Sequence, residues 1–236
     1  MMKTLKILGL LLTYPQKEMV DACQEMKDVL ENENFLPKKY LNPVYDLIDY
    51  LQDTNIWDLQ EEYVSLFDRS PSLSLHLFEH VHGESRDRGA ALVELGSLYQ
   101  EQGLEISGKE TPDYLPMFLE FISQLPLDAA QEYLENAINV IATVGVRLEK
   151  RKSPYVSVFK ALEAATNAKA DEKVVENALK EKSGEEQTFD EVDEEWEEQF
   201  AWEQPVTSDD GCPKMNNILS EINKGLKEPN DKEARQ

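Results

Sequence analysis

The chain has 236 residues and a mass of 27.1 kDa, and its hydrophobic content of 41% is enough to form a sizeable core. It carries 24 Lys and Arg against 47 Asp and Glu residues, which gives a formal net charge of −23. This charge argues against binding to nucleic acid, because contact with phosphates needs a basic surface. It favours basic partners, such as cationic segments of other proteins, although it also serves solubility.

An apolar run lies near the start of the chain, from Leu5 to Leu12, but Lys6 and Gly9 interrupt it and no small-residue cleavage site follows. We therefore expect neither a signal peptide nor direct membrane insertion, and predict a cytoplasmic protein. The two cysteines, Cys23 and Cys212, lie far apart and form no disulfide framework or metal-binding spacing.

Apolar residues recur at helical spacing along most of the chain. The clearest stripes are Met19, Cys23, Met26 and Leu30; Leu41, Val44, Ile48 and Leu51; and Ala130, Leu134, Ala137, Ile138, Ile141, Val144 and Leu148. Shorter helices are expected over residues 3–13, 55–68, 84–99, 155–168, 171–182 and 190–202. The pattern predicts an all-α, single-domain helical bundle of roughly nine or ten helices, with no strand of any length.

Capping signals predict where several helices begin. Thr111 and Ser153 each precede a proline, which is typical of an N-cap followed by proline at the first helical position. Asp128 and Gln131 have the spacing of a capping box. Gly103 is expected just past the end of the helix that begins near residue 84.

The composition changes near the C-terminus. Residues 185–203 contain ten acidic residues and no Lys or Arg, while Phe189, Val192, Trp196 and Phe200 recur at helical steps. This pattern predicts an acidic C-terminal helix that docks one face, with a solvated charged segment as the alternative. We assign residues 1–204 to a helical domain and residues 205–236 to a polar, mobile and disordered tail.

All three histidines lie within seven positions, at His76, His80 and His82. The segment from His76 to His80 matches the H-x-x-E-H pattern, in which two histidines hold zinc and the glutamate, here Glu79, acts as general base. A zinc-dependent hydrolase is therefore one hypothesis. Five residues are a weak match, however, and no third ligand can be singled out among so many carboxylates.

The alternative hypothesis for this segment is a polar turn. In it Leu75, Phe78 and Val81 pack inward, and the polar residues form a hydrogen-bonded ion network that fixes the start of the next helix. Its members are His80, His82, Glu84, Arg86, Asp87 and Arg88. Such a network can be structural or can border a ligand groove.

Other catalytic motifs are missing from the sequence. It contains no G-x-S-x-G elbow, no P-loop and no glycine-rich dinucleotide motif, and no cysteine lies near the histidines. The residues alone therefore predict an acidic helical binding module rather than an enzyme, with no metal site.

Three segments closely resemble the family of molybdenum cofactor assembly chaperones of respiratory nitrate reductase, the NarJ, TorD and DmsD family. They are Leu66–Arg69, Ser74–Gly89 and Glu110–Pro116. The resemblance extends from the Leu-Leu-Leu-Thr-Tyr-Pro sequence that ends at Pro15 to the acidic segment around Trp196.

The resemblance implies a cytoplasmic, all-helical chaperone that is not a catalyst. Its partner would be the apo catalytic (alpha) subunit of nitrate reductase, bound through a basic N-terminal peptide, alone or in the alpha-beta complex. The chaperone would support molybdenum cofactor insertion into this client before membrane docking and would keep no cofactor of its own. An amphipathic basic peptide could fold into a helix within an apolar groove rimmed by carboxylates.

The family signatures converge on the segment around His76, His80 and His82, called here the histidine-rich turn, and on residues 110–115. We take these two segments as the candidate peptide-binding site. Its residues are His80, His82, Glu84, Arg86, Asp87, Arg88, Glu110, Asp113, Tyr114 and Leu115. A purely architectural role for the second segment stays open, because Asp113 also suits the positive end of the predicted helix.

The resemblance also raises the question of cofactor contact. Arg69, Arg86 and Arg88 are candidates to receive the anionic phosphate of the pterin cofactor. A further alternative for the whole protein is an acidic structural subunit that stays in the mature enzyme complex.

Overall fold

The structure is a computed structural model, and it describes residues 2–82, 86–106 and 110–181. The predicted all-α class is confirmed, since these residues form helices and turns with no strand. The chain divides into two units, residues 1–175 and 176–236. The acidic helix, the tail and the boundary predicted after residue 204 lie outside the described residues.

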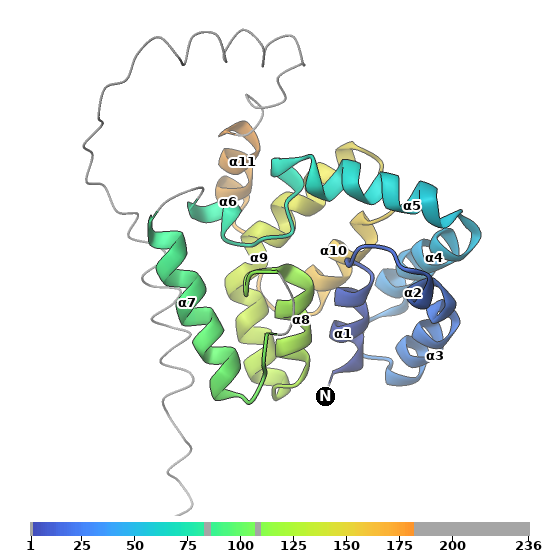
Figure 1. Cartoon of the computed structure of the whole chain (residues 1–236), viewed down its shortest axis with the longest axis horizontal. Helices are drawn as coiled ribbons and strands as arrows, with labels where there is room; N and C mark the ends of the chain where they lie inside the picture. The colour runs from blue at the N-terminus through green and yellow to red at the C-terminus, as the bar shows by residue number, and fades with distance from the viewer. Residues whose placement is uncertain (1, 83–85, 107–109, 182–236) are drawn as a thin grey trace, which may run out of the picture. The chain divides into compact units, whose positions relative to one another are not determined.

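The described residues contain eleven α-helices, a π-helical turn (η1) and a 3₁₀ turn (η2), as labelled in Figure 1. Their bounds are α1 Lys3–Leu10, α2 Lys17–Asp21, α3 Cys23–Glu33, α4 Lys38–Asp53, α5 Ile56–Tyr63, η1 Val64–Asp68, η2 Pro71–Leu73, α6 Glu79–His82, α7 Arg86–Glu101, α8 Leu115–Ser123, α9 Leu127–Lys150, α10 Val156–Ala164 and α11 Glu172–Glu181.

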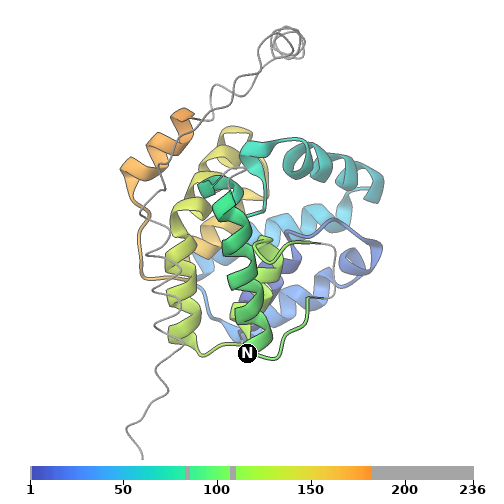
Figure 2. The same ribbon diagram turned by 60° about the vertical axis from the view of Figure 1, so that its left-hand side comes forward.

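Helix α1 lies at the centre of the packing in the first unit. It contacts α3, α8 and α10, and α10 in turn packs on α4 and α9. Figures 1 and 2 show α1 among these elements, while α7 lies at the edge of the group and comes to the front in the turned view. Leu5 and Leu8 of α1 are buried, so the apolar run near the start of the chain serves as a core helix.

Gly9 allows α1 and α8 to approach closely. A Cβ atom at Gly9 would lie 3.1 Å from the Pro116 carbonyl oxygen and 3.2 Å from the Leu119 Cβ. Both distances are shorter than ordinary van der Waals contact, so a larger residue would push the two helices apart.

The predicted apolar stripes of α4 and α9 are confirmed. Their members are buried, namely Leu41, Val44, Ile48 and Leu51 in α4, and Ala130, Leu134, Ala137, Ile138, Ile141, Val144 and Leu148 in α9. In the stripe that spans α2 and α3, Cys23, Met26 and Leu30 are buried, whereas Met19 is partly exposed. Burial of one face therefore explains why these segments are helical.

Several predicted helix starts are wrong. Helix α8 begins at Leu115 and α10 at Val156, so Thr111 and Ser153 are not N-caps. The N-cap of α9 is Pro126, which places Asp128 inside the first turn rather than in a capping box. Local capping rules assign Thr111 to the start of α8, but this residue is held instead by contacts with a distant segment, which are described below.

The described residues contain one or two more α-helices than the nine or ten predicted. The difference comes from the short α6 and from the separation of the predicted Met19–Leu30 stripe into α2 and α3. The helix predicted from residue 84 to residue 99 is α7, which begins and ends two residues later, and Gly103 lies beyond it with φ +77° as expected. The prediction that Val81 packs inward is wrong, because its side chain is exposed and Leu77 is buried instead.

Within the three described ranges, none of the helices is both long and apolar enough to span a membrane.

Candidate functional site

The two segments singled out from the sequence lie side by side. His76 and Tyr114 form an isolated antiparallel β-bridge. The Leu77 N–H donates to the Asp113 carbonyl oxygen at 3.0 Å, and the Leu115 N–H donates to the Leu75 carbonyl oxygen at 2.8 Å. The histidine-rich turn and the segment before α8 are therefore held together by their backbones.

Asp113 is the anchor of this corner. Its carboxylate has no solvent exposure and accepts hydrogen bonds from the Phe78 N–H at 3.1 Å and from the Thr111 hydroxyl. Burial alone would raise the pKa of Asp113, but these bonds and the His76 ring outweigh it and hold the pKa below its ordinary value. Asp113 is thus an ionised carboxylate that organises the turn from inside.

His76 lies between Asp113 and solvent. Its Nδ1 is 3.0 Å from the Thr111 hydroxyl and 3.4 Å from Asp113 Oδ1, and its Nε2 is 3.5 Å from a carboxylate oxygen of Glu110. Since Thr111 donates to the ionised Asp113, its oxygen accepts from the His76 N–H. The hydrogen bond to Asp113 raises the pKa of His76 above its ordinary value, against the opposing effect of burial.

A second ion pair, between Arg88 and Glu79, lies on the other side of the histidine-rich turn. Arg88 of α7 donates to Glu79 of α6 at 2.9 Å, and the His80 Nε2 is 2.7 Å from the Ser74 carbonyl oxygen. Burial works to raise the pKa of Glu79, but hydrogen bonds from Ser74 and Arg88 lower it below its ordinary value. Two members of the predicted polar network, His80 and Arg88, are thus engaged, and their partners here are Ser74 and Glu79.

The geometry needed for the zinc hypothesis is missing. Helix α6 begins at Glu79, so His76 precedes it in the bridge and the two histidines do not lie one turn apart on a helix. The rings of His76 and His80 contact different partners, and Glu79 is paired with Arg88. Among the residues the structure describes, no group of three or more His, Cys, Asp or Glu is placed to hold a metal ion.

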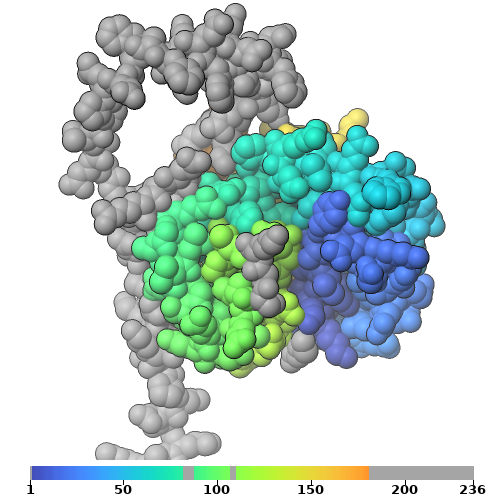
Figure 3. All heavy atoms as spheres, in the orientation of Figure 1, coloured from blue at the N-terminus to red at the C-terminus, as the bar shows by residue number. Residues whose placement is uncertain are grey.

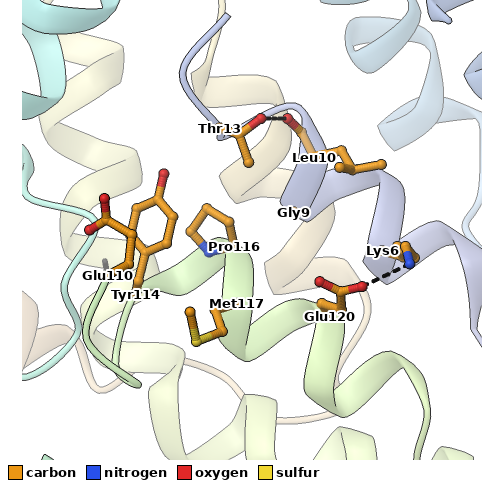
Figure 4. A pocket seen from close by; sticks show the side chains of 9 residues that line it. All are labelled: Lys6, Gly9, Leu10, Thr13, Glu110, Tyr114, Pro116, Met117 and Glu120. Carbon is orange, nitrogen blue, oxygen red and sulfur yellow. Dashed lines mark hydrogen bonds and ion pairs between the residues drawn. The ribbon is translucent and has the colours of Figure 1, made fainter. Parts of the chain in front are cut away.

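A pocket of about 200 Å³ opens next to this corner, between α1 and α8. Figure 3 shows the dark blue N-terminal residues adjoining the yellow-green residues of α8 on this face of the molecule. Leu10, Pro116 and Met117 give the pocket an apolar middle, and Glu110 and Glu120 lie toward its two ends (Figure 4). The wall beside Glu110 is the ring of Tyr114.

Tyr114 is fixed at the pocket by a chain of hydroxyl groups. The Tyr63 hydroxyl donates to the Leu12 carbonyl oxygen at 3.0 Å. The Tyr114 hydroxyl lies 3.1 Å from the Tyr63 hydroxyl and is placed to donate to it. Burial raises the pKa of both Tyr63 and Tyr114, so both phenols stay neutral at physiological pH. The turn after α1 and the last residue of α5 thereby position a residue that lies before α8.

The structure thus divides the candidate residues. Glu110 and Tyr114 line the pocket, whereas Asp113 and Leu115 are buried next to it. His80 lies in α6 and Arg88 in α7. The side chains of His82, Glu84, Arg86 and Asp87 lie outside the described residues, and Arg69 is exposed at the end of η1.

Seven further residues line the pocket that were not predicted from the sequence, namely Lys6, Gly9, Leu10, Thr13, Pro116, Met117 and Glu120. The surface position of Lys6 could have been predicted from the sequence, because a cation that interrupts an apolar helix must lie at a surface. The structure shows where it goes, since its ammonium group pairs with Glu120 of α8 at 2.8 Å.

Comparison with solved structures identifies the fold. The chain superimposes on a protein titled a putative redox enzyme maturation protein from Archaeoglobus fulgidus with a TM-score of 0.50, at 22% identity, over 69% of this chain and 91% of that one. This similarity shows a shared helical fold.

Comparison of sequences identifies the family. The family profile described as nitrate reductase delta subunit matches residues 33–161. The chain is 36% identical over 209 residues to the nitrate reductase molybdenum cofactor assembly chaperone NarJ of Escherichia coli strain K12, covering 88% of this chain and 86% of that protein. It is 42% identical over 161 residues to the probable chaperone NarW of the same strain, covering 68% of this chain and 67% of that protein.

The chain therefore belongs to the nitrate reductase delta subunit family and is a chaperone of the NarJ type. The resemblance noted in the sequence is confirmed.

Proposed function

We propose that this protein is a cytoplasmic, system-specific chaperone for respiratory nitrate reductase. It binds the basic N-terminal segment of the apo alpha subunit, alone or in the alpha-beta complex, and supports molybdenum cofactor insertion before the client docks at the membrane. The observation that carries the proposal is the 36% identity to NarJ over 88% of the chain.

The charge of the protein supports a basic client. With a net charge of −23, the surface steers a cationic peptide toward it and speeds the encounter. The pocket between α1 and α8 offers apolar side chains flanked by carboxylates, which suits one face of an amphipathic helix. A peptide that folds only on binding is held with limited affinity, which permits release.

The proposed role requires no catalytic group. The histidine-rich corner is occupied by internal hydrogen bonds and ion pairs, so in this proposal it supports the pocket and presents Glu110 and Tyr114 to the client. Cofactor insertion would follow from holding the client open, with the molybdenum cofactor passing to the client as cargo.

Calorimetric titration tests the proposal. The full-length protein is titrated with a synthetic peptide of the N-terminal segment of the alpha subunit at low and at high salt, with a scrambled peptide of the same composition as control. We expect saturable binding that weakens as salt increases, because part of the attraction is electrostatic. Absence of binding at both salt concentrations would overturn the proposal.

A second candidate follows from the family description as a delta subunit, which favours a permanent acidic subunit of the enzyme. The two roles differ in the composition of the finished complex. A chaperone co-purifies with the immature alpha subunit and is absent from active enzyme, whereas a subunit is present there in equal amount.

A further inference from the structure

The pocket between α1 and α8 is too small for a pterin cofactor. Pockets that enclose drug-sized ligands measure about 300–1,000 Å³, whereas this one measures about 200 Å³. Its middle is formed by Leu10, Pro116 and Met117, and Leu10 is one of the few large hydrophobic residues exposed on the described surface. The space and the lining suit one apolar side chain.

The charges around the pocket are unevenly engaged. Glu110 lies at one end and is 52% exposed, with its carboxylate 3.5 Å from the His76 ring. Glu120 lies at the other end and is 53% exposed, and its partner Lys6 is 36% exposed (Figure 4). Ion pairs as exposed as Lys6–Glu120 contribute little to stability, so the partner of Glu120 can be exchanged.

We propose that this pocket binds one apolar side chain of the client peptide, and that Glu120 releases Lys6 to pair with a Lys or Arg of the peptide one helical turn away. The inference rests on the proposed function and specifies its recognition rule. Residues three or four apart on a helix lie on one face, so a single helical segment can fill the pocket and reach the carboxylate.

Lys6 then acts as an internal competitor for the client's cation. It occupies Glu120 when the pocket is empty and repels the incoming charge, which disfavours peptides that cannot also fill the apolar middle. Removal of Lys6 should therefore strengthen binding of a cationic peptide, whereas removal of Glu120 should weaken it. A merely structural ion pair predicts the same effect from both changes.

The experiment compares Lys6→Met and Glu120→Gln in the full-length protein by calorimetry at low salt, with the N-terminal peptide of the alpha subunit as probe. We expect Glu120→Gln to weaken binding by about two- to fivefold and Lys6→Met to tighten it by a similar factor. The matched control is Glu149→Gln, which removes the partner of Lys160 in another exposed ion pair, and should leave affinity unchanged.

Peptide variants complete the test. Replacing each apolar residue of the peptide by Ser should identify one position whose loss weakens binding most. Replacing the Lys or Arg one turn from it by Gln should have no further effect in Glu120→Gln, which shows coupling between the two charges. Circular dichroism confirms that each variant is folded.

The outcomes separate the two proposals. If the unaltered protein does not bind the peptide, the proposed function fails. If it binds, but Lys6→Met and Glu120→Gln both leave affinity unchanged or both weaken it equally, the exchange is wrong and the chaperone role stands.

Discussion

Glu33, the last residue of α3, accepts hydrogen bonds from both the backbone N–H and the hydroxyl of Thr4 in the first turn of α1, each at 2.5 Å. The same carboxylate accepts from the Lys3 N–H at 2.9 Å. These N–H groups have no partner within their own helix, and a carboxylate there also suits the positive end of the helix dipole. Glu33 thus ties the central helix to its neighbour.

Replacing this carboxylate should lower the stability of the whole first unit. We expect Glu33→Ala to reduce the free energy of unfolding by about 1–2 kcal/mol, as for the loss of a good helix cap. Urea unfolding followed by circular dichroism measures the change. Glu31→Ala, at an exposed position of the same helix, is the control and should change stability by less than about 0.5 kcal/mol.

Two glycines should respond to alanine in opposite directions. Gly9→Ala places a methyl group against Pro116 and Leu119, and we expect a loss of about 1–3 kcal/mol from the strain. Gly89 lies in α7, where an added Cβ atom would meet nothing within 4 Å, so Gly89→Ala should gain about 0.4–1 kcal/mol. Thermal unfolding of both variants measures this, and destabilisation by Gly89→Ala would contradict it.

The buried carboxylate at the corner of the site should be costly to remove. Asp113→Ala leaves the Phe78 N–H and the Thr111 hydroxyl without their acceptor and removes the anion beside the His76 ring, so we expect a loss of about 2–3 kcal/mol. Glu110→Gln, at the exposed side of the same histidine, should cost less than about 0.5 kcal/mol. Equal losses in the two variants would show that burial does not set the role of Asp113.

The His76–Asp113 pair should make stability depend on pH. The pKa of His76 is raised above 6.5, so its contribution is complete below pH 6.5 and is lost as the pH rises through the folded-state value. The pKa of Asp113 is lowered below 3.8, so its contribution is present above pH 3.8 and is lost as the pH falls through its folded-state value. The pair is therefore most stabilising between these limits.

Comparison with a histidine variant isolates this effect. The difference in unfolding free energy between the unaltered protein and His76→Gln should be largest near about pH 5 and smaller near about pH 8.5. The groups that face the ring and share in its titration are Asp113, Glu79 and Glu110. A difference that is constant over this range would argue against a charged His76.

The sequence predicts the helices well where one face is buried over several turns. The stripe of α4, from Leu41 to Leu51, and that of α9 lie in the core as predicted, because helical periodicity alone determines which side of these long helices is apolar. Short elements escape such a rule. Helix α6 has four residues, too few for a periodic pattern to be recognised.

The candidate site shows a different limit. Thr111 and Asp113 fit local capping rules for a helix start, yet they bond to His76 and Phe78, more than thirty residues earlier in the chain. Local patterns contain no information about such partners, so only the family resemblance directed attention to these two segments together. The pocket was not predictable from either source, since it forms where α1 and α8 meet.

The pairing of Lys6 with Glu120 spans 114 residues of sequence, and Tyr114 likewise depends on Leu12 and Tyr63. Contacts of such long range are slow to form, because closing the intervening chain costs conformational entropy. A chain still being made on the ribosome would thus lack the pocket between α1 and α8 until α8 has emerged. A client peptide that needs this pocket would therefore be bound only after both α1 and α8 have been made.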